Sequence, residues 1–165
     1  MKPFRATVIC TLATVLLTAG CAGNKKEQAP PTAAQAAASL GTTLAGDDLF
    51  AFGKSGIADI SSGGRERLDA LATQLQSTPY GLVRVVGFTD RIGSDKANMA
   101  LSTRRAHAVR DYLVERGIPT ERIVATGRGR YQPVVACETE RGQALIDCLA
   151  PNRRVEITVD PPFDR

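Results

Sequence analysis

Apolar residues recur at spacings of three and four in two stretches of the chain, which is the spacing of a helix with one apolar face. The first stretch predicts a helix over about 64–76. The second predicts a helix that begins near Ser94 or Asp95 and ends near residue 116. Gly117 follows it directly, and a glycine at this place is typical of helix ends.

Alternating or β-branched runs predict four strands, at 49–52, 82–88, 122–127 and 154–159. Between the last two strands we expect a long loop, in which 143–149 forms one or two helical turns. The resulting order, β-α-β-α-β-β, indicates an α/β (α+β) sandwich. Its sheet would be mixed, with the helices packed on one face.

The first 21 residues contain a short basic segment, an apolar run and a cysteine. Lys2 and Arg5 precede an uncharged, mostly apolar run that is too short to span a bilayer and ends in Thr-Ala-Gly-Cys. Small residues followed at once by a cysteine resemble a bacterial lipobox, in which cleavage occurs before the cysteine and its thiol carries lipid. We therefore expect lipidation at Cys21. The alternative is an ordinary secretory signal in which Cys21 is incidental.

Residues 22–46 are rich in Ala, Gln, Pro and Thr, a composition typical of a linker. Ala22 stands where lipoproteins retained in the inner membrane often have Asp, so this resemblance favours the outer membrane. The predicted organisation is a signal peptide at 1–20, a lipidated cysteine with its linker at 21–46, and one folded domain at 47–165.

Charge and aromatic content argue against nucleic acid as a partner. The net charge of the chain is +4, with Lys2 and Arg5 in the leader, and there is no Trp. Two glycines alternate with two arginines at 127–130, but no helix start follows them, so they are a weak phosphate-binding signal.

Cys137 and Cys148 are the two cysteines left after the leader and the lipidation site, and they lie 11 positions apart. In an exported protein such a pair is most simply a disulfide. A loop of this size would stabilise the fold by roughly 2–3 kcal/mol. No further ligands at metal-binding spacing accompany the pair, so we expect neither a metal nor a cofactor.

An acid and an arginine stand out around the start of the second helix. Arg105 falls within the apolar stripe that includes Leu101, and a buried arginine is costly unless it is paired. Asp90, at the mouth of the preceding strand, is the obvious protein partner. Backbone N–H groups of the turn at 89–94 are expected to be free and to attract anions.

Two interpretations of this pair remain open from the spacing alone. In one, Asp90 accepts from a ligand ammonium, Arg105 grips a ligand carboxylate, and Asn98 adds a neutral hydrogen bond. In the other, Asp90 and Arg105 form an internal salt bridge that fixes the turn to the helix.

Several segments carry a specific resemblance, which covers residues 48–159. Gly-Phe-Thr-Asp-Arg-Ile-Gly-Ser at 87–94, the helix from Asn98, Gly-Ile-Pro at 117–119 and Cys-Leu-Ala-Pro-Asn-Arg-Arg at 148–154 resemble the OmpA-like peptidoglycan-binding domain. One departure is Phe88, where the family often has His.

The resemblance implies which residues hold the diaminopimelate of the peptidoglycan stem peptide. Asp90 and Arg105 take the principal positions, and backbone amides near Thr89 and Ile92 complete the site. The family also places three further side chains around the pocket, here Asn98, Leu101 and an arginine of Asn-Arg-Arg, either Arg154 or Arg153.

The function implied by the resemblance is a lipoprotein that binds peptidoglycan and tethers the outer membrane to the cell wall, with its domain facing the periplasm. The alternative is a Pal-like protein that couples wall binding to Tol proteins, and porins are other possible partners. The cysteine pair is more typical of OmpA-type sequences. An enzyme is disfavoured, because His107 is the only histidine and no nucleophile motif occurs; Glu138 and Glu140 are loop acids expected to face solvent.

Overall fold

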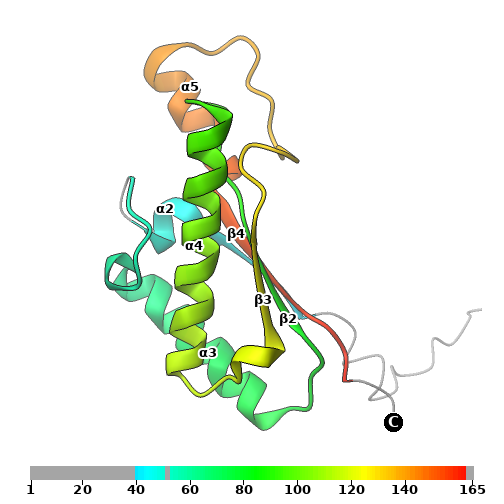
Figure 1. The fold of residues 1–165 in the computed structure, drawn as a ribbon. Coiled ribbons are helices and arrows are strands. Elements are labelled where there is room, and N and C mark those ends of the chain that lie inside the picture. The colour runs from blue at the N-terminus through cyan, green and yellow to red at the C-terminus, as the bar shows by residue number, and fades with distance from the viewer. Residues whose placement is uncertain (1–39, 51–52, 163–165) are drawn as a thin grey trace, which may run out of the picture. The chain divides into compact units, whose positions relative to one another are not determined.

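The computed structural model describes residues 40–50 and 53–162 of the chain. Its strands form one four-stranded mixed sheet with the order β1-β4-β2-β3 (Figure 1). The strands are β1 (Leu40–Ala45), β2 (Val83–Gly87), β3 (Ile123–Gly127) and β4 (Arg154–Val159). Strand β4 runs antiparallel to both β1 and β2, whereas β2 and β3 are parallel. The predicted α+β class with a mixed sheet is confirmed.

Two long helices, α3 and α4, lie on the same side of the sheet (Figure 1). The described helices are α2 (Gly46–Leu49), α3 (Ser62–Ser77), α4 (Asp95–Glu115) and α5 (Gly142–Cys148). Short 3₁₀ turns lie at Ile57–Asp59, Thr120–Arg122 and Ala150–Asn152. Both long helices and the helical turns near 143–149 agree with the sequence prediction.

Local chemistry explains where the long helices begin and end. The Ser61 hydroxyl accepts from the Gly64 N–H at 3.0 Å, and the Ser94 hydroxyl accepts from the Ala97 N–H at 3.2 Å. Each cap satisfies a backbone donor that has no partner within the helix. Gly117, which follows α4, has a φ of 87°, a conformation that glycine adopts without strain.

The core lies between this helical layer and one face of the sheet. Val83 and Val85 of β2 are buried whereas Arg84 between them is exposed, the alternation of a strand with one covered face. Leu68 of α3 and Val109 of α4 are fully buried in the same cluster.

Glycines at the ends of β2 and β3 let α4 approach the sheet closely. A Cβ atom at Gly87 would collide with the backbone carbonyl of Ser102, and one at Gly127 would collide with Thr103. The first half of α4 therefore lies directly against the carboxyl ends of two parallel strands.

The first strand is not where the sequence predicted it. Residues 40–45, assigned to the linker, form β1 and pair with β4 along its whole length. Of the strand expected at 49–52, Leu49 ends helix α2 and Phe50 makes only an isolated bridge with Ile60, while 51–52 lie outside the described residues. The linker prediction is thus wrong for 40–45.

The predicted signal peptide, Cys21 and the rest of the linker also lie outside the described residues. Among the helices that the structure describes, none has the length and apolar character needed to cross a membrane.

Replacing Gly87 by Ala is expected to lower the free energy of unfolding by about 1–3 kcal/mol, because the new methyl group must push α4 away from the sheet. Gly41→Ala on β1 is the matched control, since no atom lies within 4 Å of a Cβ placed there. Its effect should stay within about 0.5 kcal/mol. Urea denaturation of both variants tests this, and equal losses would contradict the close-approach argument.

Candidate functional site

One cavity of about 180 Å³ gathers six of the seven residues that the sequence predicted around the ligand. They come from the end of β2 and the following turn (Thr89, Asp90, Ile92) and from one face of α4 (Asn98, Leu101, Arg105). Asp47, Gly53, Ile146 and Arg153 complete the lining. We call this site the arginine cavity.

Arg105 is a buried cation that lacks an ion-pair partner. Arg105 is only 3% exposed. Within the described ranges, no carboxylate oxygen lies within 4.0 Å of its guanidinium. Its Nε donates to the Lys54 carbonyl at 3.0 Å, and the guanidinium lies 5.4 Å from the centre of the Phe50 ring. Burial lowers the pKa of Arg105, and the negative charge of Asp47 opposes this effect. The site therefore has an uncompensated positive charge at one wall.

The internal salt-bridge interpretation required Asp90 to pair with Arg105, but Asp90 has other partners. Its Oδ2 accepts from Arg153 Nη1 at 2.9 Å, and its Oδ1 accepts from the Ile92 N–H at 2.9 Å. Asp90 is 9% exposed. Each carboxylate oxygen has two lone pairs, so Asp90 keeps the capacity to accept from a ligand donor.

Arg153 bridges two acids of the cavity. Besides its bond to Asp90, its Nε and Nη2 donate to the Asp47 carboxylate at 2.9 and 2.6 Å. These hydrogen bonds, with those to Asp47 the stronger, raise the pKa of Arg153 above its usual range. Arg153 is thus neutralised within the protein, whereas Arg105 is not.

The backbone amides of the turn are already used, so the expectation that they are free for an anion is wrong at two positions. The Thr89 N–H donates to the Gly129 carbonyl at 2.8 Å, and the Ile92 N–H donates to Asp90. Asn98 Nδ2 donates to the Ile92 carbonyl at 3.0 Å, which fixes the turn to α4. The Thr89 hydroxyl oxygen is buried and has no hydrogen-bond partner in the described part of the chain.

Of the two arginines that the sequence left open, Arg153 lines the cavity and Arg154 does not. Arg154 Nε pairs with Glu156 at 2.7 Å, and its guanidinium stacks 3.9 Å from the centre of the Phe88 ring. Arg153 follows the 3₁₀ turn at Ala150–Asn152, whereas Arg154 is the first residue of β4, and the two side chains contact different partners. Phe88, the departure from the family pattern, here supports Arg154.

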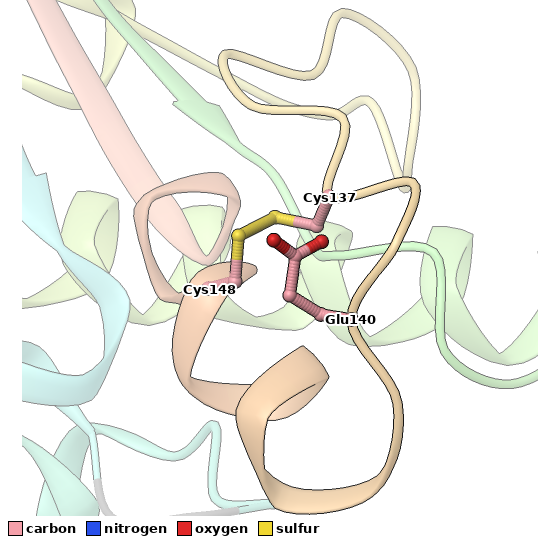
Figure 2. Close-up of side chains that lie close together, drawn as sticks. All are labelled: Cys137, Glu140 and Cys148. Carbon is pink, nitrogen blue, oxygen red and sulfur yellow. A yellow bond between two sulfur atoms is a disulfide. The ribbon is translucent and has the colours of Figure 1, made fainter.

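The predicted disulfide between Cys137 and Cys148 is confirmed, with a Cα–Cα distance of 6.1 Å (Figure 2). The loop that it closes contributes to the arginine cavity. Ile146 of α5 lines the cavity, and its carbonyl accepts from Arg153 Nη1 at 3.0 Å. At the other end of the loop, the Cys137 carbonyl accepts from Arg91 Nη2 at 2.7 Å.

Glu140 lies beside this disulfide, with its carboxylate close to the two sulfur atoms (Figure 2). The three side chains are near enough to share an ion, since their ligand atoms lie within 4.8 Å of one another. Thiolate is the form of cysteine that ligates metals, and bonded sulfur atoms offer none. In the disulfide form, the two cysteines of this cluster are a structural cross-link and not metal ligands.

Asp47 and Ile146 are cavity residues that sequence reasoning missed. Asp47 lies at the predicted start of the folded domain, just before the strand expected at 49–52, and nothing in the sequence distinguishes it from the adjacent acid Asp48. Ile146 lies in a loop whose path depends on the disulfide. The Asn-Arg-Arg resemblance was a signal for Arg153, but it did not distinguish this residue from its neighbour.

The mixed sheet and the charged cavity beside the carboxyl end of β2 indicate an α+β ligand-binding domain. The model of the OmpA family matches residues 49–146. The chain therefore belongs to the OmpA family, whose OmpA-like domain is a non-enzymatic peptidoglycan-binding domain.

Similar proteins support this membership. The Outer membrane protein A of Yersinia pseudotuberculosis is 49% identical over 122 residues, covering 71% of this chain and 34% of that protein. That of Citrobacter freundii is 44% identical over 146 residues, covering 83% and 60%. The chain thus spans less than two thirds of these relatives. The solved cell wall anchor of the T6SS from Pseudomonas aeruginosa is 30% identical, covers 74% of this chain and 82% of that one, and has a TM-score of 0.60.

Asp47→Asn is expected to lower the free energy of unfolding by about 1–2 kcal/mol, because it leaves Arg153 with one carboxylate partner instead of two. Asp48→Asn is the matched control. The Asp48 carboxylate pairs with Arg67 at 3.3 Å on the surface, where both side chains are more than half exposed. Such a pair contributes at most about 1 kcal/mol, and often nothing measurable. Urea denaturation measures both, and a larger loss for Asp48→Asn would contradict the assigned role of Asp47.

Proposed function

We propose that this protein is an outer-membrane lipoprotein whose domain binds the diaminopimelate of peptidoglycan in the arginine cavity. Lipid on Cys21 would hold the front of the chain in the outer membrane, and the domain would hold the cell wall. The protein would then tether one to the other without forming a covalent bond to the wall.

Arg105 is the observation that carries this proposal. A buried guanidinium without a carboxylate partner is costly, and an anion that arrives with a ligand removes that cost. The planar fork of Arg matches a carboxylate, to which it can donate two parallel hydrogen bonds. The free end of diaminopimelate in a stem peptide carries such a carboxylate.

The same end of diaminopimelate carries an ammonium, and Asp90 supports the proposal that it binds here. Asp90 lines the same cavity as Arg105, with Asp47 nearby as a second acid. Because Arg153 is neutralised mainly by Asp47, Asp90 retains negative charge for the ligand. The cavity is several times the ~30 Å³ share of one water, which suits an amino-acid head group.

Tethering by such a small site would depend on many copies. Charge-assisted hydrogen bonds stabilise by about 1.5–3 kcal/mol each, and desolvation and association costs offset part of this. We therefore expect modest affinity at a single site. Many lipid-anchored copies facing one polymer would bind with much higher avidity.

The membrane part of the proposal is supported by the leader, by the Thr-Ala-Gly-Cys sequence and by relatives named Outer membrane protein A. The disulfide favours an OmpA-type role over a Pal-type role with Tol proteins, because the paired cysteines before Leu-Ala-Pro resemble those of OmpA sequences.

Asp90→Ala and Arg105→Ala are each expected to abolish co-sedimentation of the full chain, held in mild detergent, with purified diaminopimelate-type peptidoglycan. Each variant removes one of the two charges that we assign to the ligand. The fraction of protein in the pellet is measured by gel densitometry, and circular dichroism verifies that each variant is folded.

Arg104→Ala provides the matched control, because Arg104 precedes Arg105 on α4 but is exposed and lies outside the cavity lining. This variant should pellet like the wild type. If the wild type stays in solution, or if the folded Asp90 and Arg105 variants pellet as it does, the proposed function is wrong.

A further inference from the structure

A second cavity, of about 400 Å³, lies on the other side of the turn that follows β2. Thr89 lines both cavities. Beyond it the side chains divide, because Asp90 and Ile92 line the arginine cavity whereas Arg91 lines the second one. The turn is therefore a shared wall. We call the second site the loop cavity, since most of its other lining residues belong to the loop after β3.

Arg91 is the cation of the loop cavity that lacks an ion pair. Its Nη2 donates to the Cys137 carbonyl at 2.7 Å, which holds the guanidinium in place. Within the described ranges no carboxylate oxygen lies within 4.0 Å of it, although Glu138 lines the same cavity. Arg130, the other arginine of the lining, is paired with Asp95 at 2.6 Å. The hydrogen bond to the Cys137 carbonyl holds Arg91 in place, and the other N–H groups of its guanidinium can donate to a ligand.

The Thr89 hydroxyl is an unsatisfied polar group in the same lining. Thr89 is 5% exposed, and its Oγ1 has no hydrogen-bond partner in the described chain. A buried hydroxyl without a partner costs free energy, which a ligand atom bonded to it would recover. The exposed Arg91 and the buried Thr89 both belong to the lining of the loop cavity.

Hydrogen bonds within the protein already order the loop segment that lines the other side of the loop cavity. The Asn152 carbonyl oxygen accepts from the N–H groups of Val134 and Val135 at 2.8 and 3.1 Å, and its amide donates to the Val135 carbonyl at 2.8 Å. The disulfide at Cys137 anchors the next turn of the same loop. A ligand that enters does not have to order this segment, and such preorganisation favours binding.

We propose that the loop cavity binds the acidic residue that precedes diaminopimelate in the stem peptide. This inference rests on the proposed function, because it assumes that diaminopimelate occupies the neighbouring cavity. In such stems a D-glutamate is joined through its side-chain carboxyl, so its α-carboxylate is free. Arg91 binds that α-carboxylate, and the Thr89 hydroxyl bonds to the peptide group between the two residues.

The test compares three synthetic ligands by titration calorimetry on the full chain in detergent. Each ligand carries diaminopimelate with its own α-carboxyl amidated. Its α-amino group is joined to acetate, to γ-linked D-glutamate, or to γ-linked D-isoglutamine, in which the α-carboxylate is replaced by a neutral amide. We expect the glutamyl ligand to bind about tenfold more tightly than either of the others.

Arg91→Gln should reduce this preference to less than twofold and leave the affinity for the acetylated ligand unchanged. Arg110→Gln, a change on α4 outside both cavities, should keep the preference. Equal binding of the glutamyl and isoglutaminyl ligands by the wild type would overturn the inference alone. If the wild type binds none of the three ligands, both the proposed function and this inference are overturned.

Discussion

Burying the Arg105 guanidinium costs free energy, and in the described part of the chain no carboxylate forms an ion pair with it, so the nearby acids offset that cost only from a distance. Asp90 and Asp47 are the nearby acids, and both are bonded to Arg153. Arg153 balances only one of the two negative charges, so the cavity keeps one cation, Arg105, for a ligand anion and one net negative charge on the acids for a ligand cation. A cavity with this distribution of charge is suited to a small zwitterion rather than to a simple anion.

The fold supplies this arrangement from distant parts of the chain. Glycines at the ends of β2 and β3 let α4 lie close to the sheet, so that its polar residues and the acid after β2 line one cavity. Residues just before β4 add Arg153, and the loop closed by the Cys137–Cys148 disulfide adds Ile146. The turn after β2 and the disulfide-closed loop also line the loop cavity. The same two segments therefore contact both proposed parts of the ligand, diaminopimelate and the acidic residue before it.

Periodicity was enough to predict α3, α4 and the three strands with β-branched alternation, because their apolar faces are recorded in the sequence. Strand β1 was not predicted, because its pairing with β4 joins residues more than a hundred positions apart and its Leu-Gly-Thr-Thr run resembles a linker. The resemblance located Asp90 and Arg105. It did not determine whether Arg153 or Arg154 faces the cavity, since that depends on where the turn at Ala150–Asn152 ends and β4 begins. It also did not show that the turn amides are used, since their partners are the distant Gly129 carbonyl and the Asp90 side chain.

The central claim is that Arg105 binds the free carboxylate of diaminopimelate. The most direct measurement is calorimetry with two stem tetrapeptides that differ only in having diaminopimelate or lysine at the third position, a difference of one carboxylate. We predict that the wild type prefers the diaminopimelate peptide at least tenfold, since one charge-assisted hydrogen bond contributes about 1.5–3 kcal/mol. Folded Arg105→Ala should bind both peptides about equally. A preference of the same size in both proteins would contradict this role of Arg105.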